Sequence, residues 1–520
     1  MKVRSITYFC SASSLEEAVD GAKAAGPTLK IAKDVLNNAG FEVQTVRLAT
    51  NSFEDFLPAH SVQDAVTSLQ QLERAAEGID FISVGTAEKR LDVVEAALGG
   101  LTDKTFFVCP LPLTSAGVPN YDTALNIAKL VCRLGASAPA KTTEVPALFR
   151  TTVTGNLDAG TPYFPGAYWR KGAPPAIGLA LEDSGLFVKA FEGQSSLDDA
   201  QATLDSTLRE ALVPLEAAGK AAAKAAGVDY SGIDCSLASS ADPAESMVKA
   251  YESLGLGPVG GAGTLSICAM ITSVLKKLPV THCGYSGIML PVTEDAGLAE
   301  RASEKRLSVQ QLLFYSAVCG TGIDTVPIEG STAPERLAMT YVDMASLAFR
   351  LKKPLSARLW PVAGKKAGDE TEVDNPFFVN TKVLALDSFV SAMPEAPGHC
   401  TVAVAATTMP EAPPVYSAAA ESVAGVSGEV SLVTNTPEVV VVRLAPESSG
   451  VAFVLRNTGS SIWPDGLQMR VLHTELQGIV TEVPSAAPGE CVTVVLLQKS
   501  GSFRLSGPGG PFGPVLVVIS

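Results

Sequence analysis

The chain has 520 residues, of which 47% are hydrophobic and 18% are charged, and its formal net charge is −15. This length predicts about three domains, or one large α/β barrel with an appendage. The negative balance repels nucleic acid backbones, and no stretch approaches the ~20 uninterrupted apolar residues of a membrane-spanning helix. We therefore expect no nucleic-acid partner and no membrane span.

The N-terminus, MKVRSITYFCSASSLEEAVDG, has a short apolar run that acids follow at once. A secretory signal needs a longer apolar core, and a mitochondrial presequence is poor in acids. The segment instead predicts a strand over residues 3–10 and a helix over 15–39. Nine scattered cysteines, with no Cys-x-x-Cys pair, favour a reducing compartment over a disulfide framework or a structural zinc site. We expect an intracellular protein, cytoplasmic or cytoskeletal, without a signal peptide.

Up to about residue 386, short β-branched runs alternate with segments of helical period, which is typical of α/β folds. Buried strands are predicted over residues 81–86 (FISVGT) and 105–110 (TFFVCP), and a long helix over 197–226. The stretch 151–178 is rich in Pro, Gly and aromatic residues and is too apolar for a free linker. We expect a loop packed over the rest of the fold, in which Tyr168 and Trp169 form a lid or are plain packing residues.

Residues 255–263, GLGPVGGAG, contain a Gly-x-Gly-x-x-Gly match. A dinucleotide fingerprint needs a strand before its glycines, but the preceding SMVKAYESLGL has a helical period. A helix is predicted after the glycines, over 264–277, so an anion bound at its N-terminus stays an open alternative.

The stretch 283–301, CGYSGIMLPVTEDAGLAER, sets an apolar run directly against two carboxylates. Residues 288–292 predict a buried strand, and Glu294 and Asp295 stand where it turns into a helix over 296–306. Acids in a first helical turn cap free N–H groups, whereas acids at the carboxyl end of a barrel strand face the active-site mouth. We expect Asp295 to cap the helix and Glu294 to face a pocket.

The stretch SAVCGTGIDTVP, residues 316–327, offers Cys319, Asp324 and Thr325 beside two glycines that permit close approach of the chain. A cysteine nucleophile needs a base to form its thiolate, and His282 is the histidine nearest in these motifs. Nothing in the sequence places the two together, so a buried structural cysteine is the alternative.

Oxygen ligands suit a hard cation such as magnesium, and the acids Glu294, Asp295 and Asp324 would supply them together with Thr325 and Tyr285. The same groups could equally stabilise adjacent turns, and no spacing rule separates the two cases. A divalent cation is therefore an open prediction.

Basic residues follow in ARLWPVAGKKAGDE, where Arg358, Lys365 and Lys366 could bind an anionic substrate or pair with the carboxylates. Two adjacent lysines in a glycine-rich turn are also typical of a solvated hairpin tip. The substrate-binding prediction therefore comprises Tyr285, Thr325, Arg358 and Lys365.

Three motifs, GYSGIMLPVTEDAGLAER, SAVCGTGIDTVPIEGST and ARLWPVAGKKAGDE, resemble in order and spacing the uncharacterised microbial family called domain of unknown function 711. The resemblance covers about residues 1–390, with GVDYSGIDCSLAS and GGAGTLS as further matches. It implies a large α/β barrel similar to that of pyruvate formate-lyase and its glycyl-radical relatives. It does not imply radical chemistry, which needs a C-terminal glycine loop opposite a barrel cysteine; no Arg-Val-x-Gly-aromatic sequence is present.

Composition shifts to Ala, Pro, Ser and Val over residues 391–429, which predicts a linker. Short β-rich runs separated by turns then predict an all-β sandwich over 430–520. The sequence FVLRNTGSSIWPDGLQMRVLH resembles the Ig-like four-tryptophan domain of selective-autophagy receptors, of whose tryptophans only Trp463 remains. Such domains bind other proteins, so the resemblance implies docking to a protein partner.

Two hypotheses follow. The sequence favours a structural or scaffolding component, docked through its C-terminal domain into a larger cytoskeletal, axonemal or organellar assembly. The alternative is an enzyme acting on a small polar or anionic substrate at the barrel mouth. In that case Glu294 is general base or metal ligand, Asp324 its partner, Cys319 part of the wall, and Arg358 or Lys365 the anion clamp. A mouth plugged by side chains would contradict the enzyme.

Overall fold

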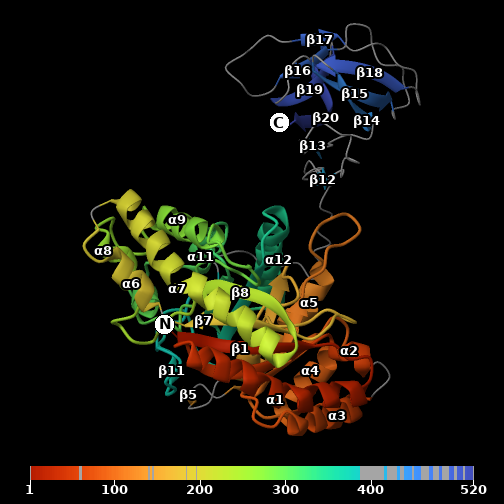
Figure 1. Cartoon of the computed structure of the whole chain (residues 1–520). Helices are drawn as coiled ribbons and strands as arrows, with labels where there is room; N and C mark the ends of the chain where they lie inside the picture. The colour runs from red at the N-terminus through yellow and green to blue at the C-terminus, as the bar shows by residue number, and fades with distance from the viewer. Residues whose placement is uncertain are drawn as a thin grey trace. The chain divides into compact units, whose positions relative to one another are not determined.

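The computed structural model describes residues 2–57, 61–138, 141–142, 146–182, 184–194 and 196–386, and beyond them the nine C-terminal strands given below. The chain forms two compact units, Met1–Met393 and Pro394–Ser520 (Figure 1). Among the residues described, no helix is long and apolar enough to cross a membrane.

One half of the main sheet contains five strands that are parallel to their neighbours. In spatial order they are β1 (Lys2–Cys10), β2 (Glu42–Thr50), β3 (Phe81–Thr86), β4 (Thr105–Pro110) and β6 (Thr151–Gly155). The predicted strands at 81–86 and 105–110 are confirmed with the same bounds. Their burial on both faces explains why these runs are continuously apolar.

The other half runs in the opposite direction, with β7 beside β1 and β10 beside β6, both antiparallel. It contains β7 (Ala176–Glu182), β8 (Asp229–Leu237), β9 (Gly322–Glu329) and β10 (Leu355–Val362). The pairs β7–β8 and β9–β10 are parallel, so β8 and β9 are the two edges of a nine-stranded sheet.

Both edges hydrogen-bond to one extended segment, residues 281–292. At its start, the Ile233 N–H of β8 donates to the Thr281 carbonyl at 2.8 Å, and the Ile233 carbonyl accepts the Cys283 N–H at 3.1 Å. At its end, the carbonyl of Asp324 in β9 accepts the Val292 N–H at 3.1 Å. The bridges on both sides are parallel. The segment therefore closes the sheet into a ring. It is not the regular strand predicted over 288–292, because Pro291 has no N–H to donate to a ladder.

Helices cover the outer face of the ring. The longer ones are α1 (Leu15–Asn38), α3 (Val62–Ala75), α4 (Leu91–Gly100), α5 (Tyr121–Ser137), α7 (Leu197–Ala226), α9 (Thr264–Lys276), α10 (Ala296–Ser303) and α12 (Pro334–Arg350). The shorter elements are α2 (Phe53–Phe56), α6 (Gly185–Phe191), α8 (Met247–Ser253), α11 (Val309–Tyr315), η1 (Ala147–Arg150) and a two-stranded sheet of β5 (Lys141–Thr142) and β11 (Glu372–Val373). Figure 1 shows α1, α3 and α4 gathered beside β1.

The two faces of the strands pack into different cores. Ile6 and Leu48 belong to the large core that the helices share, whereas Phe9 and Ala49 belong to a small cluster with Trp169. Side chains alternate along a strand, so the second set lies on the inner face of the ring. Burial on both faces confirms the predicted mixed α/β class.

The connection between the two halves, residues 156–175, packs on this inner face. Trp169 stacks on Phe9 of β1 with ring centroids 4.9 Å apart, and Ser83 of β3 donates to a carbonyl of the loop. The Tyr163 hydroxyl lies 2.6 Å from a carbonyl of β7 and 2.5 Å from one of β8. The apolar stretch is therefore packed against the fold, as its composition predicted.

The second unit contains antiparallel strands in two sheets. One has the order β12 (Val415–Ser417), β13 (Val430–Val433), β20 (Gly510–Val518), β19 (Gly501–Gly507), β16 (Gln468–Val471), β17 (Val480–Glu482). The other has the order β14 (Val439–Glu447), β15 (Gly450–Asn457), β18 (Cys491–Leu496). Trp463 lies outside the described residues, and the Ig-like sandwich and the 391–429 linker stay predictions.

Candidate functional site

Three of the predicted site residues meet on the inner face of the ring. Arg358 of β10 donates from Nε to Oδ1 of Asp324 at 2.6 Å and from Nη2 to Oδ2 at 2.8 Å. The same Nη2 donates to Oε1 of Glu294 at 2.9 Å. Ala357 and Leu359 belong to the outer core, so Arg358 between them points inward. We call Glu294, Arg358 and Asp324 the inner cluster.

The backbone at the inner cluster departs from regular geometry. The register of β9 and β10 shifts between Ala357 and Leu359, opposite Asp324 and Thr325, and such bulges re-aim side chains. Thr325 has a φ of 44°, which a β-branched residue rarely adopts. Its buried hydroxyl has no hydrogen-bond partner. Strain and an orphaned polar group are features that proteins retain where a site requires them.

The inner cluster keeps contact with accessible space. Its side chains are 21% (Glu294), 13% (Arg358) and 10% (Asp324) exposed, whereas Trp360, two residues along β10, is 1% exposed. Burial raises the pKa of Glu294, although Arg358 opposes that shift. In the described part of the chain, Oε2 of Glu294 has no hydrogen-bond partner. A carboxyl with a raised pKa and a free oxygen is suited to accepting and returning a proton.

A second ion pair crosses the junction between the two halves. Arg4 of β1 donates to Glu182 of β7 at 2.6 Å, and the two side chains are 30% and 25% exposed. Burial lowers the pKa of Arg4, but Glu182 and Glu294 raise it by more. This pair is therefore within electrostatic reach of the inner cluster. The sequence signal was a charge inside the apolar strand KVRSITYFC, which the pattern analysis did not use.

The predicted cation site does not form from these residues. All four contacts of Asp295 turn away from the inner cluster, to Ser246 Oγ and to the N–H groups of Met247, Gly297 and Leu298. The predicted capping of α10 is thereby confirmed, and Asp295 also holds the start of α8. Arg358 lies between the other two acids, where a cation would have to sit. No group of three His, Cys, Asp or Glu able to hold a metal exists among residues that the structure describes.

Among the described contacts, neither Tyr285 nor Cys319 hydrogen-bonds to the inner cluster, although Tyr285 lies within electrostatic reach of Asp324 and Arg358. Tyr285 and Cys319 line a cavity of about 320 Å³ that Lys276 and Lys353 also border. The Cys319 thiol is fully buried and accepts from the Gly322 N–H. The only described contact of the His282 ring with a thiol is with Cys235, at 3.5 Å. The structure therefore does not bring His282 to Cys319; the basic side chain near this thiol is Lys353, whose pKa burial lowers.

Asp234 in β8 is a buried acid that the sequence analysis missed. It accepts the N–H groups of Tyr285 at 2.7 Å, Ser286 at 2.8 Å and Ser236 at 3.0 Å. Burial raises its pKa despite these bonds. Because it anchors the closing segment, Asp234 positions the chain that leads to Glu294. The signal was a single acid within the buried run GIDCSL.

Lys365 is not brought to Arg358. Its ammonium pairs with Glu372 at 2.5 Å, and its backbone N–H closes a turn onto Val362. The turn after β10 does not match the solvated hairpin tip that was the alternative, because only 19% of the Lys365 side chain is exposed. Arg358 and Lys365, predicted as alternative anion clamps, each pair with a carboxylate of the chain, and the clamp stays a prediction.

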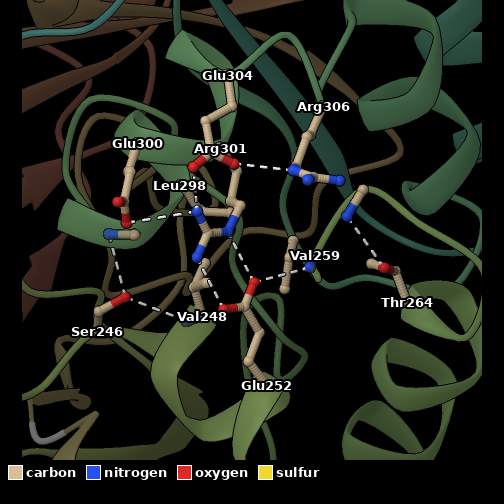
Figure 2. Close-up of polar contacts among 12 residues, drawn as sticks. Ser246, Val248, Glu252, Val259, Thr264, Leu298, Glu300, Arg301, Glu304 and Arg306 are labelled. Carbon is tan, nitrogen blue, oxygen red and sulfur yellow. Dashed lines mark hydrogen bonds and ion pairs between the residues drawn. The ribbon is translucent and has the colours of Figure 1, made fainter. Parts of the chain in front are cut away.

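The glycine run 255–263 follows α8 and not a strand, as its preceding period predicted. Figure 2 shows how it is held: Arg301 pairs with Glu252 at 2.7 Å, and Glu252 accepts the Val259 N–H at 3.0 Å. Gly260 has a φ of +94°, and a Cβ there would lie 2.1 Å from a backbone oxygen. These glycines permit close packing at the start of α9.

A cavity of about 540 Å³ lies beyond the carboxyl ends of β2 and β3. Tyr168 and Trp169 line it together with Asn51 and Thr86. The aromatic residues predicted as a lid therefore border a cavity. Glu294, Arg358 and Asp324 are not among the residues that line it.

The sequence profile of the family described as "Uncharacterised ACR (DUF711)" matches residues 1–374. A UPF0210 protein of Pyrobaculum arsenaticum is 30% identical over 360 residues, which cover 65% of this chain and 78% of that protein. UPF0210 proteins of Methanopyrus kandleri (27% identical, 67% and 81% covered) and Limosilactobacillus reuteri (26%, 66% and 79%) are also similar. The profile match ends before the C-terminal strands.

Among solved structures, the anaerobic ribonucleotide reductase of Thermotoga maritima in complex with dATP and CTP aligns with a TM-score of 0.35 and 9% identity. The alignment covers 69% of this chain and 74% of that one. A similarity of this size supports no conclusion about fold or activity.

Proposed function

Because the chain belongs to the DUF711 (UPF0210) family of uncharacterised proteins, we propose that its α/β unit is an enzyme that moves a proton on a small polar or anionic molecule. The molecule binds inside the ring, which we take to be an α/β barrel of the pyruvate formate-lyase type without radical chemistry. The observation that supports this proposal is the inner cluster. There the partly accessible Glu294 accepts a hydrogen bond from Arg358 through only one of its two carboxylate oxygens.

In this proposal Glu294 is the general acid and base. Asp324 binds Arg358 through two hydrogen bonds and fixes its orientation, so Asp324 and Arg358 are positioning residues. The buried Thr325 hydroxyl, which has no hydrogen-bond partner in the described part of the chain, would have to be uncovered before it could bind a substrate. Cys319 and Tyr285 are then residues of the wall, and no step passes through a metal.

The experiment uses the full chain and deuterium exchange. The protein is incubated in D₂O with a panel of small carboxylic acids and phosphorylated metabolites, and mass spectrometry detects exchange of carbon-bound hydrogen. We expect Glu294→Gln to fold and to exchange roughly 10²–10⁴ times more slowly than wild type, the usual range for loss of a general base. Glu300→Gln is the matched control, because Glu300 lies on α10 with 64% of its side chain exposed.

Two outcomes contradict the proposal. One is exchange by Glu294→Gln at the wild-type rate. The other is gross unfolding of this variant, judged by circular dichroism, since that would make Glu294 a structural residue.

A second proposal concerns the C-terminal unit, whose antiparallel strands lie beyond the family match. We propose that residues 430–520 are an Ig-like domain that docks the chain to another protein of a larger assembly. Sedimentation of a cell extract tests this. Wild-type protein should sediment with large complexes and Trp463→Ala should not, whereas wild-type protein found only as a free species contradicts docking.

A further inference from the structure

Arg47 in β2 is a buried cation without an acid. Its side chain lies on the inner face, since Ala49 two residues on belongs to the inner cluster of apolar residues around Trp169. The residue is 6% exposed. In the described part of the chain its one hydrogen bond runs from Nε to the Thr45 hydroxyl at 3.1 Å, and no carboxylate lies within 4 Å of its nitrogens.

Two aromatic rings hold the guanidinium in place. Its Cζ lies 5.3 Å from the ring centroid of Phe81 in β3 and 5.2 Å from that of Phe164 in the 156–175 loop. Such contacts fix the plane of an arginine but leave its N–H donors unused. Neither Nη atom is among the fully buried nitrogens without a partner, so both reach accessible space.

The free energy of this arrangement is unfavourable without a further partner. Buried charges in proteins are normally paired, because desolvation of an ion costs several kcal/mol. Burial, and then repulsion from Arg4, lowers the pKa of Arg47 to about 9. Asp80 and Glu182 attract this charge without contacting it and only partly offset that shift, so the site holds a cation that no described carboxylate contacts.

A second unsatisfied group lies beside Arg47. In the register of β1 and β2, Ser5 lies opposite Thr45 and Thr7 lies opposite Arg47. Ser5 lies on the same face of β1 as Phe9, which is the inner face. The Ser5 hydroxyl is fully buried and has no hydrogen-bond partner in the described part of the chain. A hydroxyl donor beside an arginine with free N–H groups is the donor set that carboxylate and phosphate oxygens require.

We infer that Arg47, with Ser5, binds the anionic oxygen group of the molecule on which Glu294 acts. The inference rests on the proposed function and assigns its substrate to carboxylates or phosphate esters. Arg4 lies within electrostatic reach of both Arg47, the proposed anion-binding residue, and Glu294, the proposed general acid and base. The clamp is thus Arg47, and not the already paired Arg358 or Lys365.

The test measures the melting temperature of the full chain with malonate or inorganic phosphate, against sodium chloride at equal ionic strength. We expect one of these anions to raise the melting temperature of wild type, and the stronger effect distinguishes a carboxylate site from a phosphate site. Arg47→Met should weaken binding roughly tenfold to a hundredfold, which is the usual value of hydrogen bonds to a charged group. Arg209→Met, which removes an exposed arginine paired with Asp205, should bind as wild type does.

Without an anion, Arg47→Met should melt no lower than wild type, because it removes an uncompensated buried charge. Wild type that responds to neither anion, or Arg47→Met that responds equally, overturns the inference. Loss of folding in Arg47→Met also overturns it. Glu294→Gln should still bind the anion. If the proton-transfer proposal is wrong, anion binding is still observed, whereas if the anion site is wrong, wild type itself shows no anion response that depends on Arg47.

Discussion

Two arginines in this protein each bind more than one carboxylate, and their surroundings differ. Arg301 binds Glu252 and Glu304, with Glu300 at 3.5 Å, on the outside of the ring, between α8 and α10, in the network of Figure 2. Arg358 binds Glu294 and Asp324 on the inside, between β10, β9 and the end of the closing segment.

The surroundings distinguish a structural network from a candidate site. In the outer network Glu252 also accepts the Val259 N–H, and Glu304 accepts from Arg306, so the acids are well satisfied. At the inner cluster, Thr325 is strained and its hydroxyl is orphaned. An arginine between acids therefore does not mark a site by itself; unsatisfied groups and strain do.

The largest expected difference is in the cost of removing each arginine. Arg358→Met leaves Glu294 and Asp324 close together without a cation, in a place where burial already penalises charge. Breaking a buried pair in this way costs about 3–5 kcal/mol. Denaturant unfolding at pH 7 measures the loss, with Arg358→Lys as the variant that keeps the charge. A cost below about 1 kcal/mol would place the inner cluster with ordinary surface pairs.

A smaller effect concerns the pH dependence that the inner cluster imposes. Burial raises the pKa of Glu294, so the folded state keeps this proton to a higher pH than the unfolded chain. The stability from that proton is present below the ordinary glutamate pKa of about 4.3 and is lost as pH rises through the folded value. Glu294→Gln cannot lose a proton, so its free energy of unfolding should rise relative to that of wild type as pH increases above about 4.3.

Unfolding curves at several pH values measure this difference, and Glu300→Gln on the surface of α10 is the control that should show no trend. If the difference in free energy of unfolding between Glu294→Gln and wild type shrinks as pH rises, the effect of Arg358 on the pKa of Glu294 outweighs that of burial. The same titration bears on activity, because a general base works only above its own pKa.

Local patterns predicted much of the fold but not how the site is assembled. The strands at 81–86 and 105–110 and the helix over 197–226 follow from apolar runs and helical period, which depend on neighbouring residues alone. Glu294 and Asp324 were predicted from their place after apolar runs. Their shared contact with Arg358 could not be, because it depends on the closing segment meeting β9 across the ring.

The inner arginines were missed for a related physical reason. Arg4 and Arg47 lie in strands that are buried on both faces over much of their length, so polar and apolar residues do not alternate in a way that distinguishes the inner face from the outer. The sequence does not show which side chains surround a single basic residue in such a strand. Its role can therefore be judged only when the residues of the inner face are known. Lys365, by contrast, was over-interpreted because nearness to Arg358 in sequence does not bring a turn residue to the inner face.

The smallest expected effect is at the outer network. Arg301→Met removes a pair whose acids, Glu252 and Glu304, are 25% and 40% exposed, so water solvates them once the cation is gone. Partly exposed pairs contribute little, and we expect a loss of about 0.5–1 kcal/mol in the same denaturant assay, with no change in anion binding. A loss as large as that of Arg358→Met would show that both arginines are structural. The inner cluster would then need its strain and its free groups explained without a ligand.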